Sequence, residues 1–449
     1  MFFLKNNNII NLTKKIKSNK AVISIIGLGY VGLPLCLAFT KANFKVFGID
    51  NNLERIKILK KGNSYISTIN NLQVKKACNK KFLPTNNFRE ILNSDIVIIC
   101  VPTPIDASKK PNMQYVQNVV IQINKYVKKN QIIILECTSY PGTTEEFFLP
   151  MFKKKGLNIG KDIFLGYSPE REDPGNLKHS ILRKNLPKVV SGYSKNCEKI
   201  IKKIYQKVSN KVYMCSNIRT AEFTKLLENI YRSVNIGLIN ELHSVCKKMG
   251  INTFEALEAA KTKPFGFSAF YPGPGVGGHC IPVDPYYLTF KAKRHGVITK
   301  FIKLAGQIND ERPIEISNTI ANYVRNKKIK KNILFFGITY KKNPDDVRES
   351  PITKIYRLLR KKIKNKIYVC DPLVNTYGLK TLKGIKFVKL KKLKNSNFIN
   401  SFEVCFIGAN HDIFDYNFIA NKFKVIFDSR NSFKKLKKNM NVLKKLKYI

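Results

Sequence analysis

Short apolar runs, rich in isoleucine and valine, alternate with segments of helical spacing along the first half of the chain. Apolar runs of this length, bounded by turn residues, are typical of strands that are buried on both faces of a parallel sheet. Helical segments between them are typical of crossover connections. The pattern therefore predicts a doubly wound α/β sheet, with strands at Val22 to Ile26, Lys45 to Ile49, Ile96 to Val101, Ile132 to Glu136 and Phe164 to Tyr167 and a first helix at Leu33 to Ala42.

From Asn217 the pattern changes to one long helix. Apolar residues recur at helical spacing for about seven turns without a proline, and Met249-Gly250 ends the run. A short helix is predicted at Thr253 to Ala260. The long helix carries more apolar surface than one small domain needs, so we expect it to join domains and to pair two subunits.

A second α/β unit is predicted near residue 330. Its strands are expected at Asn332 to Gly337, Ile367 to Cys370, Val404 to Ile407 and Val425 to Asp428, with a helix at Ile352 to Leu359. The expected fold class is two doubly wound, Rossmann-like domains joined by a long central helix and a small helical domain. The expected boundaries are 1–20 (basic extension), 21–215 (first α/β domain), 216–325 (central helical domain), 326–433 (second α/β domain) and 434–449 (basic tail, exposed and dispensable).

The charge balance is strongly basic. The 449 residues carry 81 Lys and Arg against 30 Asp and Glu, a formal charge of +51, and 68 of the basic residues are lysines. A nucleic-acid-binding protein would be expected to use more arginine for bidentate contacts. We therefore interpret the excess mainly as solvated surface that favours anionic ligands. A basic nucleic-acid-binding protein and a catalytically inactive NAD sensor stay as alternatives from other classes.

The ten cysteines are scattered and form no C-x-x-C pair, which predicts neither a zinc site nor a disulfide framework, and so no bound metal. Residues 1–20 lack the apolar core of a signal peptide, and no window has the ~18 apolar residues of a membrane-spanning helix. A reducing, cytoplasmic location without membrane insertion is the expectation.

A dinucleotide fingerprint follows the first strand. Gly27, Gly29 and Gly32 form G-x-G-x-x-G, enclosing Tyr30 and Val31, and an acid, Asp50, ends the second strand. In this pattern the first glycine allows the turn, the second admits the pyrophosphate at the helix N-terminus and the third permits close helix packing. A carboxylate at position 50 binds the ribose hydroxyls and repels a 2′-phosphate, so NAD is the expected cofactor.

Polar loops follow the next three strands. They contain Pro102-Thr103, Cys137-Thr138 and the segment Ser168 to Asn176, which includes Glu170 and Arg171. Because ligands bind at the carboxyl ends of parallel strands, three such loops predict one shared crevice. Thr143 and Glu146 also have the spacing of a capping box for the next helix.

The segment YPGPGVGGHCIPVD, Tyr271 to Asp284, is the most constrained stretch of the chain. Its glycines and prolines are unsuited to a core strand or helix and typical of a loop held against a ligand. Cys280 follows His279 and precedes Asp284 by four residues, so a nucleophilic thiol lies near two groups able to influence its proton. The alternative is that Cys280 is a small buried apolar residue, which is the commoner fate of cysteine.

Two further polar sets have both a functional and a structural interpretation. Lys225 and Asn229 lie four residues apart on one face of the long helix, where they interrupt apolar positions, although both could be simply solvated. Lys341 and Arg348 lie in a charged loop of the second α/β unit and are available for phosphate or base, or could also be solvated.

Together these segments resemble the nucleotide-sugar 6-dehydrogenases, the superfamily of UDP-glucose and UDP-N-acetylhexosamine dehydrogenases, from Ala21 to about Asp428. The resemblance is carried by GLGYVGLP, VPTP, SPERxxPG, AEFTKLLEN, the loop around Cys280 and YKKNPDDVRESP. Within the superfamily KPFGF, SPEREDPGN and PYYL look like the branch that acts on UDP-N-acetylglucosamine. The UDP-glucose branch usually has a lysine beside the loop aspartate, where this chain has Val283.

The resemblance implies oxidation of the sugar C6 alcohol to a carboxylate, using NAD twice, for surface polysaccharide biosynthesis, with residues 21–215 as the NAD-binding domain and residues 326–433 as the UDP-binding domain. A homodimer is expected from the long central helix. It implies a thiohemiacetal and then a thioester on Cys280, with UDP-glucose and UDP-N-acetylmannosamine as alternative substrates. The implied catalytic residues are Cys280, Lys225, Asp284, Asn229, Glu170 and Thr138. The implied cofactor contacts are Gly27, Gly29, Tyr30, Val31, Gly32, Asp50, Pro102, Thr103, Thr138 and Arg348, and the implied substrate contacts are Glu170, Arg171, Lys225, Asn229, Tyr271, Gly273, Gly277 and Lys341.

Overall fold

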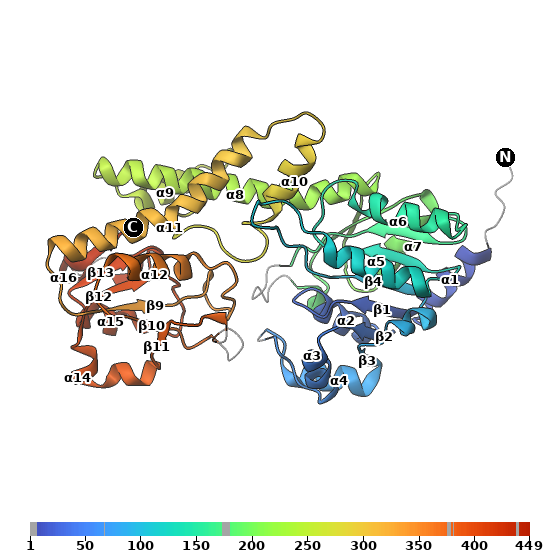
Figure 1. Ribbon diagram of the computed structural model, residues 1–449, viewed down its shortest axis with the longest axis horizontal. Helices are drawn as coiled ribbons and strands as arrows, with labels where there is room; N and C mark the ends of the chain where they lie inside the picture. Colours follow the sequence, from blue (N-terminus) through green and yellow to red (C-terminus); the bar gives the residue numbers. More distant parts are fainter. Residues whose placement is uncertain (1–6, 67, 173–179, 375–378, 380, 437–439) are drawn as a thin grey trace. The chain divides into compact units, whose positions relative to one another are not determined.

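The computed structural model describes residues 7–66, 68–172, 180–374, 379, 381–436 and 440–449 (Figure 1). Within these ranges the chain divides into two compact units. The first contains residues 1–228 and 286–297, and the second contains residues 229–285 and 298–449. Each unit is built on its own sheet, as the sequence predicts.

The first sheet has the strand order β3-β2-β1-β4-β5-β6-β7-β8 among the described residues. Its pairs are parallel except that β7 runs antiparallel to β6. The central strands are buried on both faces, which is why their sequences are continuous apolar runs. The strands are β1 (Val22–Ile26), β2 (Lys45–Ile49), β3 (Phe82–Thr85), β4 (Ile96–Ile99), β5 (Ile132–Leu135), β6 (Phe164–Tyr167), β7 (Lys188–Gly192) and β8 (Val212–Met214).

Helices connect these strands and cover the sheet. The predicted first crossover helix is confirmed as α2, which packs on β2. The helical elements of this unit are α1 (Asn7–Lys17), α2 (Gly32–Lys41), α3 (Leu53–Lys60), α4 (Asn71–Lys80), η1 (Phe88–Asn93), α5 (Gln114–Tyr126), α6 (Thr143–Lys154), η2 (Ile181–Arg183), α7 (Lys195–Tyr205) and α10 (Asp284–Lys293).

The N-terminal basic segment contributes to this core. Leu12 and Ile16 on α1 are buried, and α1 packs against α7. Its lysines lie on the other side of the helix, where most are exposed, so basic composition and a docked helix are compatible here.

The predicted capping box at Thr143 and Glu146 is wrong. Gly142 occupies the N-cap of α6 with a left-handed φ of 98°, and no side chain of that residue can cap the helix. Instead the buried carboxylate of Glu222 accepts hydrogen bonds from the backbone N–H groups of Gly142, at 2.5 Å, and Thr144, at 2.9 Å. Glu222, about 80 positions away in the sequence, therefore caps the helix in the place of Glu146, which the local spacing had predicted for this role.

The predicted long helix is confirmed as α8 (Ile218–Lys248), which begins in the first unit and ends in the second. Gly250, at φ 71°, follows it, and α9 (Thr253–Lys261) is capped by the Asn252 side chain. In the second unit α8 packs closely on α11 (Lys300–Asn326), where Gly237 faces Ala305. No helix in the described ranges is long and apolar enough to cross a membrane.

The second sheet is parallel throughout, with the order β11-β10-β9-β12-β13-β14 among the described residues. Its strands are β9 (Asn332–Phe336), β10 (Ile367–Cys370), β11 (Lys386–Phe387), β12 (Phe402–Ile407), β13 (Val425–Asp428) and β14 (Leu446–Tyr448). The remaining helical elements of this unit are α12 (Pro351–Lys362), η3 (Leu390–Lys394), α14 (Ser396–Ile399), α15 (Tyr416–Lys422), η4 (Lys434–Leu436) and α16 (Met440–Lys445).

The prediction of an exposed, dispensable tail at 434–449 is wrong. β14 pairs with β13 and completes the second sheet, and Val442, Leu446 and Ile449 are buried in its core. Each such aliphatic side chain contributes about 1.5 to 3 kcal/mol on full burial, so the segment stabilises the unit. The lysines of this segment that the structure describes are largely exposed, and the prediction of an exposed tail had rested on the lysine content.

Candidate active site

The glycine-rich turn in the first unit lies between the carboxyl ends of β1 and β4. Gly27 has a φ of 92°, and its N–H donates to the carbonyl of Ile49 at 2.8 Å. A Cβ on Gly27 would lie 2.7 Å from the Cys100 carbonyl oxygen, and one on Gly32 would lie 1.9 Å from the Gly27 carbonyl oxygen. Neither position can accept a side chain, so the turn and the close approach of α2 both require glycine.

The same turn fits a phosphate. A Cβ on Gly29 would meet no atom within 4 Å, so the backbone is open on that side. Tyr30 and Val31 are half-buried beside it, and Val31, the N-cap of α2, makes no side-chain cap hydrogen bond. A helix N-terminus of this kind binds anions through its backbone N–H groups.

Asp50 is buried at the end of β2, where the sequence places the ribose-binding acid. Its carboxylate accepts hydrogen bonds from the N–H groups of Leu28 and Asn52, both at 2.8 Å, and forms an ion pair with Arg55 at 3.3 Å. The acid is thus fixed against the glycine turn. Thr103, buried, and Pro102, exposed, follow β4 along the same carboxyl edge of the sheet.

The second sheet repeats this arrangement without the full glycine pattern. Gly337 follows β9 with a φ of 77°, and its N–H donates to the Cys370 carbonyl at 2.9 Å. Asp371 follows β10 and accepts from the N–H groups of Ile338, at 2.7 Å, and Leu373, at 3.1 Å. Asp371 was not among the predicted site residues, although an acid directly after the second strand was a usable signal.

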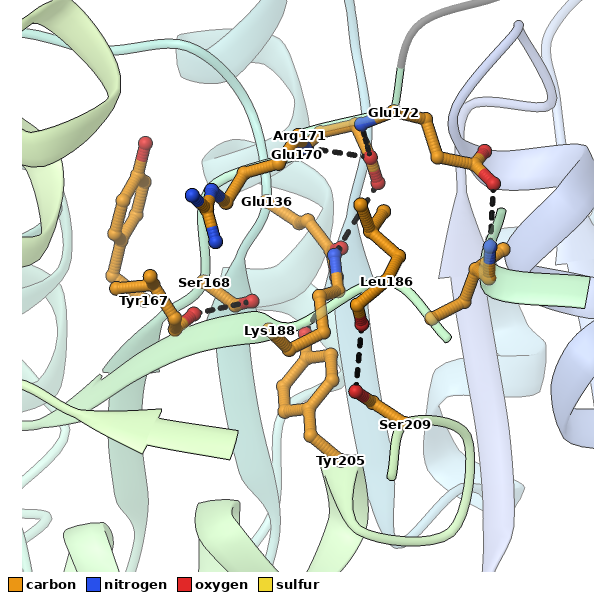
Figure 2. A network of polar contacts seen from close by, with 12 residues as sticks. Glu136, Tyr167, Ser168, Glu170, Arg171, Glu172, Leu186, Lys188, Tyr205 and Ser209 are labelled. Carbon is orange, nitrogen blue, oxygen red and sulfur yellow. Dashed lines mark hydrogen bonds and ion pairs between the residues drawn. The ribbon is translucent and has the colours of Figure 1, made fainter. Parts of the chain in front are cut away.

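A buried network surrounds Glu170 in the first unit (Figure 2). The Glu170 Oε1 accepts the backbone N–H groups of Arg171, at 2.7 Å, and Glu172, at 2.5 Å, while its Oε2 lies 3.3 Å from the Lys188 Nζ. Lys188 also pairs with Glu136, which receives a hydrogen bond from the Tyr205 hydroxyl at 2.5 Å. Both Lys188 and Glu136 are inaccessible to solvent.

The pKa values in this network follow from burial and from one shared ammonium. Burial alone would raise the pKa of Glu170, but Lys188, the Glu172 N–H and Lys225 hold it below its usual value. Burial raises the pKa of Glu136 to about 7 against the opposing effect of Lys188. Burial and the Glu170 charge raise the pKa of Glu172. Of the three carboxyl groups in this network, Glu170 is therefore the one whose ionised form is favoured most.

Other predicted residues of the first unit lie around this network. Lys225 on α8 is buried and acts electrostatically on Glu170. Arg171 is held by an ion pair with Glu228, also on α8, at 2.7 Å. Thr138, half-buried, follows β5 two residues after Glu136. Part of the predicted third loop, residues 173–176, lies outside the described residues.

In the second unit Cys280 lies on a tight, exposed turn. All ten cysteines belong to the described residues, and Cys280 is the exposed one, with Cys78 and Cys246 half-buried and the others buried. The structure thus contradicts the alternative of a small buried apolar residue. The Cys280 carbonyl accepts the N–H groups of Val283, at 3.0 Å, and Asp284, at 2.8 Å, as α10 begins.

The structure brings Asn229 and Asp284 together. Both are buried, and the Asn229 Nδ2 donates to the Asp284 Oδ2 at 2.5 Å. Since Asp284 is the first residue of α10, the N-terminal end of that helix favours its negative charge.

The cysteine loop, residues 271–284, also packs against the loop 340–351. A Cβ on Gly277 would lie 2.6 Å from the Tyr340 Cβ, and one on Gly278 would lie 2.9 Å from the Tyr340 ring. The Gly278 N–H donates to the Arg348 carbonyl at 3.0 Å. The side of Gly277 where a Cβ would lie is therefore closed by the loop 340–351.

The remaining predicted residues are fixed by neighbours in the second unit. The backbone of Gly273 is held by Asn240 at 3.0 Å and Arg312 at 3.2 Å. The side chains of the other three are exposed or half-buried: Tyr271 donates to Glu258 at 2.7 Å, Arg348 forms a bidentate ion pair with Asp346, and Lys341 is half-buried. In the described residues no group of three His, Cys, Asp or Glu side chains could hold a metal ion.

A parallel sheet with a glycine turn that fits a pyrophosphate, a second sheet of the same order and an exposed thiol together define an NAD-dependent dehydrogenase. Residues 21–209 match the NAD binding domain, 219–311 the central domain and 334–435 the UDP binding domain of the UDP-glucose/GDP-mannose dehydrogenase family. The chain belongs to this family.

The relatives of the chain include dehydrogenases named for two UDP-N-acetylhexosamines. The chain is 36% identical to the UDP-N-acetyl-D-glucosamine 6-dehydrogenase of Pseudomonas aeruginosa, over 79% of this chain and 83% of the relative. It is 37% identical to the UDP-N-acetyl-D-mannosamine dehydrogenase of Methanocaldococcus jannaschii, over 74% and 75% of the two chains. The structure of Staphylococcus aureus Cap5O, a UDP-N-acetyl-mannosamine dehydrogenase, matches with a TM-score of 0.78 and 31% identity, over 92% of this chain and 95% of that one. The predicted family, enzyme class and cofactor are confirmed.

Proposed function

We propose that the protein oxidises the C6 alcohol of UDP-N-acetylglucosamine to the carboxylate in two steps, through a covalent bond to Cys280. One observation carries the proposal. Of the ten cysteines Cys280 is the exposed one, on a turn that leads directly into the buried Asn229 and Asp284 pair. A thiol kept accessible on so constrained a loop is suited to nucleophilic catalysis.

In the first step a base removes the hydroxyl proton and C6 loses a hydride. NAD, when bound, accepts a hydride in each of the two steps. We assign Gly27, Gly29, Gly32 and Asp50 to hold it, together with Tyr30, Val31, Pro102, Thr103, Thr138 and Arg348 as further contacts. Lys225 and Asn229, four residues apart on α8, stabilise the negative charge that develops on the C6 oxygen.

In the second step the Cys280 thiolate adds to the C6 aldehyde and forms a thiohemiacetal. Loss of hydride from that carbon leaves a thioester, and attack by water releases the carboxylate and regenerates the thiol. Asp284 receives the thiol proton and activates the water. Glu170 and Thr138 orient that water and the sugar, and Arg171, Tyr271, Gly273, Gly277 and Lys341 complete the substrate contacts.

The proposed substrate is tested by comparing four UDP-sugars. We expect NADH formation, followed at 340 nm, to be fastest with UDP-N-acetylglucosamine, at two NADH per sugar. UDP-N-acetylmannosamine, UDP-N-acetylgalactosamine and UDP-glucose are the comparison substrates, and the expected discrimination is roughly tenfold or more in kcat/KM, since a lost or misplaced polar contact costs at least that much. A higher kcat/KM with UDP-N-acetylmannosamine would reassign the substrate, and no NADH with any of the four would overturn the function.

We also propose that the chain pairs with a second copy through α8. In the second unit this helix and Met249, which directly follows it, expose an apolar stripe, defined as Tyr231, Leu238, Leu242, Val245 and Met249. The steps of seven, four, three and four residues keep these side chains on one face, the pattern of a helix that packs on another helix.

Light scattering after size exclusion is expected to give twice the 51.5 kDa chain mass for the wild type and a smaller particle for the Leu238→Lys, Leu242→Lys double variant. A buried lysine pair in the seam would be poorly solvated, so dimerisation should weaken by roughly 100-fold or more. Asn397→Lys adds charge at an exposed site of the same unit and is the control. An unchanged mass for the double variant would contradict the proposed interface.

A further inference from the structure

Lys188 is a buried lysine that neither the sequence pattern nor the proposed mechanism uses. It is the first residue of β7, and β7 runs antiparallel to β6 with Tyr167 opposite Ser191. Continuing that register beyond the end of β6 sets Lys188 opposite Glu170. The two side chains meet there, with the Lys188 Nζ 3.3 Å from the Glu170 Oε2 (Figure 2).

Lys188 also joins two loops that both carry proposed site residues. Glu136, its other carboxylate partner, lies two residues before Thr138 on the loop after β5. Glu170 lies on the loop after β6. Tyr205 on α7 lies beneath the pair, with its hydroxyl on Glu136 and its ring centroid 5.5 Å from the Lys188 Nζ. One ammonium group therefore fixes both loops at the carboxyl edge of the sheet.

The charges around Glu170 come from four elements. Lys188 from β7 and Lys225 from α8 favour its ionised form, while Glu136 at the end of β5 and Glu172 on its own loop oppose it. Arg171 is already paired with Glu228, and Glu172 is held by the Ser180 hydroxyl at 2.7 Å. Lys188 is the ammonium group in contact with Glu170, and among the groups that favour the charged form of Glu170 it has the largest effect.

We propose that Lys188 is a positioning residue, which holds Glu170 in place as a carboxylate, while Glu136 competes for the same ammonium. This inference rests on the proposed function, in which Glu170 orients the water and the sugar. A purely structural lysine would close the end of the sheet by pairing with Glu136 and would have no effect on the ionisation of Glu170.

The test is the pH dependence of kcat for three variants. Lys188→Met is expected to lower kcat by roughly 10- to 100-fold, because the carboxylate loses its placement. Its acid limb should move to higher pH by about one unit or more, because an opposite charge within contact distance shifts a carboxyl pKa by that amount. Glu136→Gln should leave the limb near its wild-type pH, because Glu136, with a pKa of about 7, is already neutral where Glu170 titrates. Lys188→Arg should restore most of kcat.

A titration that needs no turnover separates this inference from the function itself. In protein labelled with 13C at the glutamate carboxyl, the Glu170 signal, assigned with Glu170→Gln, should titrate at higher pH in Lys188→Met and near the wild-type pH in Glu136→Gln. If Lys188→Met alone does not fold, the Lys188→Met, Glu136→Gln double variant removes one charge of each sign and is compared with Glu136→Gln. The control is Lys195→Met, which removes an exposed lysine paired with Glu198.

The outcomes are distinguishable. A Glu170 titration that moves to higher pH in Lys188→Met and stays near the wild-type pH in Glu136→Gln supports the inference, whether or not any UDP-sugar is oxidised. A wild-type protein that forms no NADH would overturn the proposed function and leave this titration to decide the role of Lys188. A Glu170 titration and acid limb that stay fixed while only the melting temperature falls would make Lys188 structural.

Discussion

The Cys280→Ser variant is expected to lose overall oxidation by roughly 1000-fold or more, the scale on which enzymes lose rate when their nucleophile is removed. A serine hydroxyl is a far weaker nucleophile at neutral pH than a thiolate, so the aldehyde cannot be captured and the second oxidation fails. Because Cys280 is exposed on its turn, the substitution should disturb no core packing. Binding of NAD and UDP-sugar should stay near the wild-type level in calorimetric titrations.

Two measurements check this result. Steady-state NADH formation is compared with that of Cys246→Ser, which alters a half-buried cysteine on α8 and should keep its activity. Mass spectrometry of acid-quenched wild-type enzyme should find the sugar acyl group on the peptide that contains Cys280. Full activity of Cys280→Ser, or the absence of any such adduct during turnover, would remove the covalent mechanism.

The Lys225→Met variant is expected to slow the first hydride step by roughly 100- to 1000-fold, the usual cost of removing one group that stabilises a developing oxyanion. Lys225 is buried on the same face of α8 as Asn229, and methionine keeps its length and its apolar stem without the charge. The effect should therefore fall on the rate of the step more than on the affinity for substrate.

Single-turnover absorbance at 340 nm with excess enzyme isolates this step, because it reports the first NADH before the thioester forms. Lys248→Met, an exposed lysine at the end of the same helix, is the matched control. A first-turnover rate equal to that of the wild type would mean that Lys225 has only a structural role.

The sequence predicted best those elements whose signal is local. The strands β2, β6 and β13 begin and end where the apolar runs do, because strands buried on both faces cannot include charged residues in their interior. The glycine turn and Asp50 were predictable for a related reason: their geometry excludes most other residue types.

Long-range pairing explains what the sequence did not reveal. A lysine at the start of a strand, such as Lys188 in the run Lys188 to Gly192, is usually solvated. Here β7 runs antiparallel to β6, and this reversed direction places Lys188 beside Glu170. The segment Leu446 to Tyr448 is short and flanked by lysines, and its pairing with β13 supplies the burial that its composition hides. Glu222 likewise caps a helix that begins far from it in the sequence.

The contact of Gly277 and Gly278 with Tyr340 has a consequence for how enzymes of this kind diversify. Neither glycine can gain a side chain unless the loop 340–351 moves, because a Cβ on Gly277 would lie 2.6 Å from the Tyr340 Cβ and 2.9 Å from the Glu349 carbonyl oxygen, and one on Gly278 would lie 2.9 Å from the Tyr340 ring. The two stretches must then be inherited as a matched set, although more than 60 residues of chain separate them. A chimera that took one stretch from each of two parents would misfit at this contact wherever the parents differ in these residues.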